Sequence, residues 1–325
     1  MTAVHTRGGL WPYVEVARPD HWVKNVFMIL GVLLALFYRP GVPAAGWVGT
    51  LLVALLATCL VASSNYALNE LLDGPTDRAH ATKRYRPVPS GRVRPGLVIA
   101  EWAALAACGL ALAWQVNRPF AAAALALWLM GIVYNVPPLR TKEWPYLDVL
   151  TESLNNPIRL LLGWFVLIPG RVPPVSLTLA YWMLGAFFMA VKRLAEYRRF
   201  ANAEAASAYR RSFGHYTVER LLVGIVFYAT TSALFAGIFI VRYRLELILA
   251  VPLFAGLFAV YLRMGLRPES AAEHPERLHR EAGLVLYAAV CLAVAVALMV
   301  TDLPFLYRWF RVEPIAVSPL WTIGH

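Results

Sequence analysis

Four polar side chains recur every four residues at the end of a long apolar run: Asn65, Asn69, Asp73 and Asp77. Where the chain is helical, this spacing places them on one face, and Gly74-Pro75 is predicted to end regular helix before Asp77. Carboxylate and amide oxygens suit Mg²⁺, which prefers oxygen ligands and keeps a phosphate oxygen as partner. The pattern therefore predicts that Asp73, Asp77 and Asn69 hold magnesium on a diphosphate, with Asn65 contributing to substrate binding.

A basic segment follows at once and could neutralise the remaining phosphate charge: Lys83, Arg84 and Arg86. A polar helix end followed by a solvated basic loop would give the same pattern. The carboxylates adjoin an apolar span, however, where charge is expensive and ionisable groups are functional candidates. This favours a diphosphate site at a membrane surface, with Lys83 taking part in catalysis.

Other polar side chains stand where apolar runs begin or end, and they are predicted to contact substrate or phosphate. Membrane anchoring is the alternative for Lys24 and Asn25. A purely topological role is the alternative for Arg140 and Lys142. These candidates are Lys24, Asn25, Tyr134, Arg140 and Lys142.

The apolar segment near 148–168 carries charged side chains at helical spacing: Asp148, Glu152 and Arg159. Ionisable groups inside a membrane usually face the bundle interior and pair with one another. Glu152 and Arg159 are seven residues apart, about two helical turns, and are expected on one face. All three are candidates for substrate binding, and a structural salt bridge between helices is the alternative.

A basic turn ends the run near 174–192, where Lys192, Arg193 and Glu196 lie within about one turn of each other. Lys192 and Glu196 form an i,i+4 pair. This setting suits phosphate binding by lysine and arginine better than a second metal cage. A solvated charged face is the alternative.

The elements that position these residues must be membrane helices. The chain has 325 residues, of which 59% are hydrophobic and 15% charged, whereas a soluble domain carries about 25% charge. Lipid cannot satisfy free backbone groups, so the predicted fold is an all-α polytopic bundle. Nine segments are long enough to span a bilayer, near 23–38, 46–69, 97–116, 119–137, 148–168, 174–192, 217–241, 245–264 and 282–301.

The distribution of basic residues predicts the orientation. The N-terminus and the loops after spans two, four, six and eight hold 22 of the 30 lysines and arginines, and the other loops hold seven. The positive-inside rule places the first set, and with it the Asp73/Asp77 loop, in the cytoplasm. The chain is therefore predicted in a bacterial inner membrane, and its net charge of +11 reflects topology and binding of anionic lipid or phosphate rather than nucleic acid.

Taken together, the chain resembles the UbiA superfamily of intramembrane transferases over essentially its whole length. The resemblance rests on the nine spans, on Asn69-x-x-x-Asp73-x-x-x-Asp77, and on Arg86-Pro87-x-Pro89-Ser90-Gly91. It implies a helical bundle around a central cavity that opens to the cytoplasm and to lipid, with a Mg²⁺-bound diphosphate substrate. It also implies a single transferase domain over 1–325, in which the loops at about 70–96 and 193–216 cap the active site.

Within the superfamily, classical prenyltransferases carry a second Asp-x-x-x-Asp motif after span six, where this chain reads Lys192-Arg193-x-x-Glu196. With Arg18-Pro19-x-x-Trp22-x-Lys24-Asn25, this is similar to the polyprenyl-phosphate (decaprenyl-phosphate) phosphoribosyltransferases. Asp148-x-x-x-Glu152 as a displaced acidic pair would instead favour a prenyl diphosphate donor, so prenyl transfer or cyclisation is the alternative. A non-enzymatic carrier would more often contain inverted repeats, and none is found in the sequence. A homo-oligomer is left open.

Overall fold

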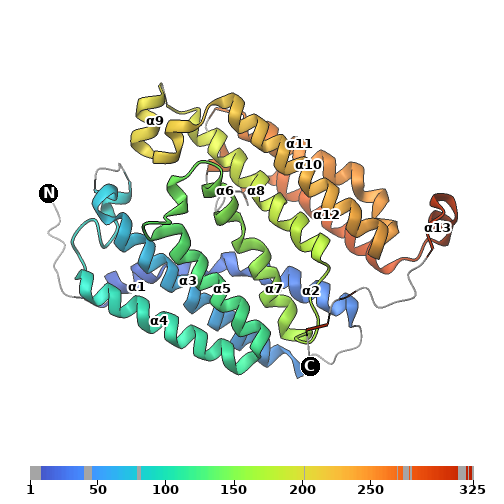
Figure 1. Ribbon diagram of the computed structural model, residues 1–325, viewed down its shortest axis with the longest axis horizontal. Helices are drawn as coiled ribbons and strands as arrows, with labels where there is room; N and C mark the ends of the chain where they lie inside the picture. Colours follow the sequence, from blue (N-terminus) through green and yellow to red (C-terminus); the bar gives the residue numbers. More distant parts are fainter. Residues whose placement is uncertain are drawn as a thin grey trace. The chain divides into compact units, whose positions relative to one another are not determined.

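The structure of the protein is a computed structural model, and its described part consists of residues 9–39, 46–78, 82–200, 202–268, 270–273, 278, 280–313, 320 and 322–323. Regular secondary structure in these ranges is helical (Figure 1). Eight helical runs among them are long and apolar enough to cross a membrane, and they correspond to eight of the nine predicted spans. The predicted all-α membrane fold is confirmed.

The chain divides into two compact units. The first contains Met1–Thr141, Ile158–Arg171 and Ile323–His325, and the second contains Lys142–Pro157 and Val172–Thr322. Each unit has its own buried core and is described by itself.

In the first unit the long helix α3 packs against both α4 and α5 (Figure 1). Apolar side chains from α1, α3, α4 and the loop before α4 form a small core around Val16, Ala67 and Val98. This core ties the N-terminal segment and that loop to the end of α3 where the predicted site lies. The helices are α1 (Trp11–Ala17), the 3₁₀ helix η1 (Pro19–Phe27), α2 (Met28–Tyr38), α3 (Val48–Asp77), η3 (Lys83–Tyr85), α4 (Pro95–Val116), α5 (Arg118–Asn135) and most of α7 (Asn155–Leu167).

In the second unit α8 is the central helix and packs against α6, α10 and α11. Its core is built around Phe187, Val191 and Leu194, with Phe213 and Leu221 packed against them. The helices are α6 (Leu147–Ser153), α8 (Val175–Tyr197), α9 (Ala203–Tyr209), η5 (Arg211–His215), α10 (Val218–Tyr243), η6 (Leu245–Ala250), α11 (Val251–Gly265), η7 (Ala271–Glu273), α12 (Ala282–Val300) and α13 (Pro304–Phe310); η4 (Thr141–Glu143) begins at the boundary of the units.

The fifth predicted span is not one helix. It is divided at Leu154 into α6 and α7. Pro157 explains the division, because it lacks the N–H that would bond the Ser153 carbonyl and its ring crowds that carbonyl. Asn155 Nδ2 donates to the Glu152 carbonyl at 3.1 Å and satisfies a backbone group that the interruption leaves open.

Helix α3 continues further than predicted. It runs through Gly74 and Pro75 to Asp77, so the expectation that helix ends before Asp77 was wrong. The helix continues although Pro75 lacks the N–H that would bond the Leu71 carbonyl. Thr76 Oγ1 donates to the Asp73 carbonyl at 2.9 Å in this last turn. Asp73 and Asp77 are therefore one helical turn apart on the same helix. Gly74 lets the following loop approach closely, because a Cβ there would lie 2.9 Å from Val88 Cγ1.

Two glycines bring α2 and α7 into close contact in the first unit. Gly31 lies against the backbone of Leu160, and Gly163 lies against the backbone of Met28, with no room for a side chain at either position. Small residues at such crossings are typical of membrane helices, where packing replaces the hydrophobic driving force.

Candidate active site

The end of α3 gathers acidic and basic side chains in the first unit. Asp73 Oδ1 accepts a hydrogen bond from Arg140 Nη2 at 3.0 Å. Asp77 Oδ2 accepts one from Arg86 Nη1 at 2.9 Å, and Lys83 Nζ lies 3.7 Å from its other oxygen. Lys83 and Arg86 can reach Asp77 because η3 and the turn after it fold back toward the helix. We call these five residues the α3 cluster: Asp73, Asp77, Lys83, Arg86 and Arg140.

Amide side chains line the same helix one turn earlier. Asn69 Nδ2 donates to Asn135 Oδ1 at 2.8 Å, and Asn135 Nδ2 donates to the Gly131 carbonyl at 2.9 Å. Because Asn69 uses its nitrogen in this bond, its amide oxygen stays an acceptor. Asn135 was not selected as a candidate from the sequence, although its place just before the Pro137-Pro138 helix stop was the available signal.

The donor set fits a hard cation. Within the described ranges, no three histidine, cysteine, aspartate or glutamate side chains cluster as a metal cage. Asp73 and Asp77 offer two carboxylates, and Asn69 offers an amide oxygen on the same helix. Mg²⁺ is commonly bound by one or two carboxylates with substrate phosphates completing the shell. These three residues therefore suit a Mg²⁺ ion that arrives with a phosphorylated substrate.

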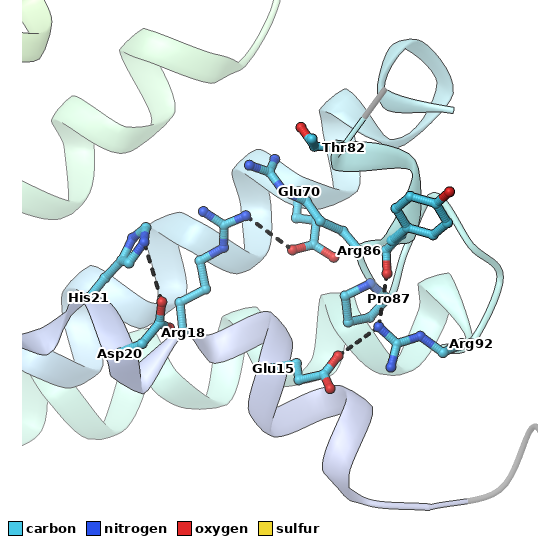
Figure 2. Close-up of a pocket in the computed structure, with 10 residues that line it drawn as sticks. Glu15, Arg18, Asp20, His21, Glu70, Thr82, Arg86, Pro87 and Arg92 are labelled. Atoms are coloured by element: carbon cyan, nitrogen blue, oxygen red, sulfur yellow. Dashed lines mark hydrogen bonds and ion pairs between the residues drawn. The ribbon is translucent and has the colours of Figure 1, made fainter. Parts of the chain in front are cut away.

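A pocket of about 400 Å³ adjoins the α3 cluster in the first unit (Figure 2). Arg86 lines it, together with Arg18 of the N-terminal segment and Glu70 of α3. Burial lowers the pKa of the Arg86 guanidinium, and the positive charge of Arg18 lowers it further. Arg18 belongs to a motif noted in the sequence, but neither Arg18 nor Glu70 was selected as a site residue.

Glu70 fastens the loop that follows α3. Its carboxylate is buried and accepts a hydrogen bond from the backbone N–H of Val88 at 3.1 Å, while Arg18 Nη2 lies 3.6 Å from its second oxygen. A buried carboxylate held by a backbone N–H fixes the loop that carries Lys83 and Arg86. The sequence signal was a carboxylate directly after Asn69 inside the apolar run.

Asn25 and Arg159 form a separate buried pair in the first unit. Arg159 Nε donates to Asn25 Oδ1 at 3.0 Å, and Asn25 Nδ2 donates to Cys59 Sγ at 3.2 Å. Glu152 and Arg159 were predicted on one helix, and the structure places them on two, α6 and α7, which are divided at Leu154. This arrangement favours a structural role for Asn25 and Arg159 in holding the N-terminal segment to α3 and α7.

The other predicted candidates differ in their surroundings. Asn65 Nδ2 donates to the Leu127 carbonyl at 2.9 Å and packs between α3 and α5. Arg84 is exposed and its guanidinium lies over the ring of Tyr85, 4.8 Å from the centroid, because η3 turns it away from its neighbour Lys83. Three further candidates are half-buried, namely Lys24, Tyr134 and Lys142.

A second charged group surrounds Arg193 in the other unit. The Arg193 side chain is 2% exposed, and its nitrogens donate to Asp148 at 3.1 Å, to Glu152 at 2.6 Å and to Glu196 at 3.0 Å. Asp148 and Glu152 lie one turn apart on α6, as predicted. The group also contains Lys192, 3.8 Å from Glu196, and Arg210, 3.4 Å from Asp148. We call these six residues the α8 cluster: Asp148, Glu152, Lys192, Arg193, Glu196 and Arg210.

Hydroxyl groups complete the α8 cluster. Tyr216 donates to Asp148 Oδ1 at 2.7 Å, and Ser212 donates to Asp148 Oδ2 at 3.3 Å. Burial raises the pKa of Tyr216 well above its usual value, and the adjacent Asp148 raises it further, so the hydroxyl stays protonated as a donor. Both carboxylate oxygens of Asp148 therefore accept hydrogen bonds, and Arg193 is engaged by three carboxylates. Phosphate contact by Arg193 and a second acidic pair at Asp148 and Glu152 stay predictions.

Comparisons with known proteins agree with this fold. A model of the UbiA prenyltransferase family matches residues 26–280. A UbiA homologue from Archaeoglobus fulgidus, solved bound to DMAPP and Mg²⁺, superposes with a TM-score of 0.67 at 20% identity and covers 89% of this chain and 99% of that chain. At this identity, the likeness concerns the fold.

Two curated relatives have different activities. A decaprenyl-phosphate phosphoribosyltransferase of Mycolicibacterium smegmatis is 29% identical over 216 residues, which is 64% of this chain and 63% of that protein. A protoheme IX farnesyltransferase of Alkalilimnicola ehrlichii is 32% identical over 241 residues, which is 69% of this chain and 76% of that protein. The match therefore spans less than two thirds of the first relative and about three quarters of the second, and both are named as transferases.

Proposed function

Because the chain belongs to the UbiA prenyltransferase family, we propose that it is an integral membrane transferase that displaces diphosphate from its donor. We propose further that the donor is phosphoribosyl diphosphate and the acceptor a polyprenyl phosphate. The named activity of the mycobacterial relative supports this choice.

One observation carries the choice of donor: the two charged clusters differ in their balance of carboxylates and cations. The α3 cluster sets two carboxylates against three cations at a partly exposed helix end. In the α8 cluster, Arg193 draws three carboxylates onto one guanidinium. A single acidic site with surplus positive charge suits a donor that has one diphosphate and one separate phosphate.

The residues of the α3 cluster have distinct roles in this reaction. Asp73, Asp77 and Asn69 would hold Mg²⁺, which when bound supplies Lewis-acid stabilisation of the diphosphate. Lys83, Arg86 and Arg140 neutralise charge that develops on the leaving diphosphate, an electrostatic stabilisation that is large in a water-poor site.

The chemistry needs little help from a general base. An oxygen of the acceptor phosphate, which is already anionic, forms a bond to the anomeric carbon of the donor. The bond from that carbon to the diphosphate oxygen breaks, and the electron pair leaves with the diphosphate. Exclusion of water by the surrounding apolar helices protects the cation-like carbon from hydrolysis.

The proposal includes the setting of the enzyme. The bias of basic residues supports a cytoplasm-facing active site in a bacterial inner membrane. The family match at residues 26–280 extends through parts of both units and supports one transferase domain. The role of the loops at about 70–96 and 193–216 as a cap stays a prediction, and residues 79–81 and 201 of these loops lie outside the described residues.

Prenyl transfer to a small acceptor is the second candidate function. The observation that favours it is the 32% identity to a protoheme IX farnesyltransferase. In that reaction an allylic cation would form as the diphosphate leaves, and an aromatic or other small acceptor would be alkylated.

The test is to offer the purified protein two kinds of labelled donor in lipid nanodiscs. One arm contains phosphoribosyl diphosphate, Mg²⁺ and a polyprenyl phosphate, and the other contains prenyl diphosphates with candidate acceptors. Release of inorganic diphosphate and a labelled lipid product in the first arm alone supports phosphoribosyl transfer. Turnover in the second arm alone would replace it with prenyl transfer.

A further inference from the structure

The pocket beside the α3 cluster is built by segments distant in the sequence (Figure 2). Its walls come from α1 and η1, from Glu70 on α3, and from the loop that ends at Arg92. A volume of about 400 Å³ lies in the range of pockets that bind small molecules. The pocket is therefore large enough for part of a phosphorylated substrate.

Arg18 reaches into this pocket without a hydrogen bond. Its side chain is only 19% exposed, and its nearest carboxylate oxygen, on Glu70, lies 3.6 Å away. The guanidinium also lies 5.9 Å from the centroid of the Tyr66 ring. Among the described residues, no acceptor lies within hydrogen-bonding distance of its five N–H donors. The Arg18 donors line the pocket and are not sealed from it, so a ligand that supplies acceptors can bind them without breaking a hydrogen bond within the described part of the chain.

The other two arginines of the pocket differ in role: Arg92 is structural, and Arg86 has nitrogens that can bind a ligand. Arg92 Nη2 forms an ion pair with Glu15 at 2.7 Å and donates to the Tyr85 carbonyl at 3.0 Å, so Arg92 holds the wall together. Arg86 uses Nη1 for Asp77, and its other nitrogens have no hydrogen-bond partner in the described part of the chain. Arg18 and Arg86 thus direct donors into the same space.

We propose that this pocket binds a phosphate monoester through Arg18 and Arg86, beside the diphosphate held by the α3 cluster. Two guanidinium groups match the three oxygens and the double negative charge of a monoester, because each can donate two parallel hydrogen bonds. Arg86 also contacts Asp77 and so joins the two phosphate sites. The inference rests on the proposed function, since it assumes a phosphorylated substrate. The monoester is either the 5-phosphate of the donor or the lipid phosphate of the acceptor.

Direct binding tests this without turnover. The probes are ribose 5-phosphate for the donor group and a short-chain polyprenyl phosphate for the acceptor group, each titrated into protein in nanodiscs. Arg18→Gln should weaken binding of one probe by about 10-fold or more, the usual size of a lost charge-assisted hydrogen-bond pair. Arg94→Gln, at an exposed arginine at the start of α4, is the matched control and should leave both affinities unchanged.

Further variants separate binding from folding. Arg18→Gln leaves Glu70 buried without its cation, so R18Q/E70Q removes both charges together and should fold as well as E70Q while binding the probe as weakly as R18Q. Arg18→Lys keeps the charge but loses the two-pronged geometry, and an intermediate affinity is expected.

The outcomes are distinct. A loss confined to ribose 5-phosphate assigns the pocket to the donor, and a loss confined to the lipid phosphate assigns it to the acceptor; both support monoester binding. Unchanged affinity for both probes in folded R18Q/E70Q, or an equal loss in R94Q, would overturn it. Failure of the proposed function appears differently, as intact monoester binding with no turnover of phosphoribosyl diphosphate.

Discussion

The two charged clusters of this protein contain similar residues and differ in burial. In the α3 cluster, the side chains of Asp73, Arg140 and Lys83 are 19, 18 and 36% exposed. In the α8 cluster, Arg193 is 2% exposed and Asp148 is fully buried. The first has two carboxylates and three cations, and the second has three of each.

This difference separates a binding site from a structural network. Partly exposed ion pairs contribute little to stability, so Asp73 can exchange Arg140 for a metal or a diphosphate at low cost. Asp77 is 7% exposed, but its partners Lys83 and Arg86 are 36 and 27% exposed and can turn toward a ligand. Buried pairs behave differently, because removal of one partner leaves a charge in a low-dielectric interior. The α8 cluster therefore suits a role in fixing α6, α8 and the segment around Tyr216.

The largest expected effect is on catalysis. Asp73→Asn should reduce turnover by on the order of 10³-fold, because a charged ligand of the leaving-group site is lost. The thermal unfolding midpoint should stay near that of the parent protein, since Asp73 and its partner Arg140 are both partly exposed. Diphosphate release from labelled donor measures the first quantity.

Asp302→Asn is the matched control for this variant, because Asp302 is 82% exposed and pairs with Arg244 outside the α3 cluster. It should retain parental activity. Full activity of Asp73→Asn would remove the metal-site mechanism.

The second largest expected effect is on the stability of the protein, through the α8 cluster. Arg193→Met should destabilise the protein by about 3–5 kcal/mol, because three carboxylates lose their common buried partner. Thermal or denaturant unfolding followed by size-exclusion recovery measures the loss. A variant as stable as the parent protein would contradict the structural role and reopen Arg193 as a ligand contact.

A smaller effect is expected at Tyr216. Tyr216→Phe removes the donor to Asp148 and the acceptor of the Tyr146 N–H, at a cost of about 1–3 kcal/mol. The folded state holds the Tyr216 proton more tightly than the unfolded state, so the parent protein should lose stability as pH rises above about 10. Unfolding midpoints between pH 8 and 11 should fall less steeply in the variant, since it lacks the titrating group.

The control for Tyr216 is Tyr228→Phe, because the Tyr228 hydroxyl makes no hydrogen bond within the described ranges. Its unfolding midpoint should lie close to the parental value at neutral pH. An equal loss in both variants would assign the effect to packing rather than to the bond with Asp148.

The smallest effect is expected at an exposed ion pair of the second unit. Arg211 is 81% exposed and lies 3.1 Å from Glu143. Arg211→Ala should change the free energy of unfolding by less than about 1 kcal/mol, the usual worth of a surface pair. A change as large as that of Arg193→Met would mean that burial does not distinguish the two kinds of pair.

The sequence by itself determined the membrane fold and the main acidic motif. Long apolar runs must be helical in lipid, whatever their neighbours, so eight of the nine predicted spans and their rough ends follow from the positions of these runs. The four-residue spacing of Asn69, Asp73 and Asp77 likewise places them on one helix face. The local sequence was sufficient for these features, because each span and the acidic motif can be recognised within one helix at a time.

Only the tertiary structure decided which charges meet. Arg140 reaches Asp73 from 67 residues away, and Arg193 collects carboxylates from α6 as well as from its own helix. The sequence suggested one helix face for Glu152 and Arg159, but the helix is divided at Leu154, and the tertiary structure joins Glu152 to Arg193 and Arg159 to Asn25. An ion pair between distant segments depends on how helices pack and on how far burial excludes water, and neither quantity is contained in local spacing.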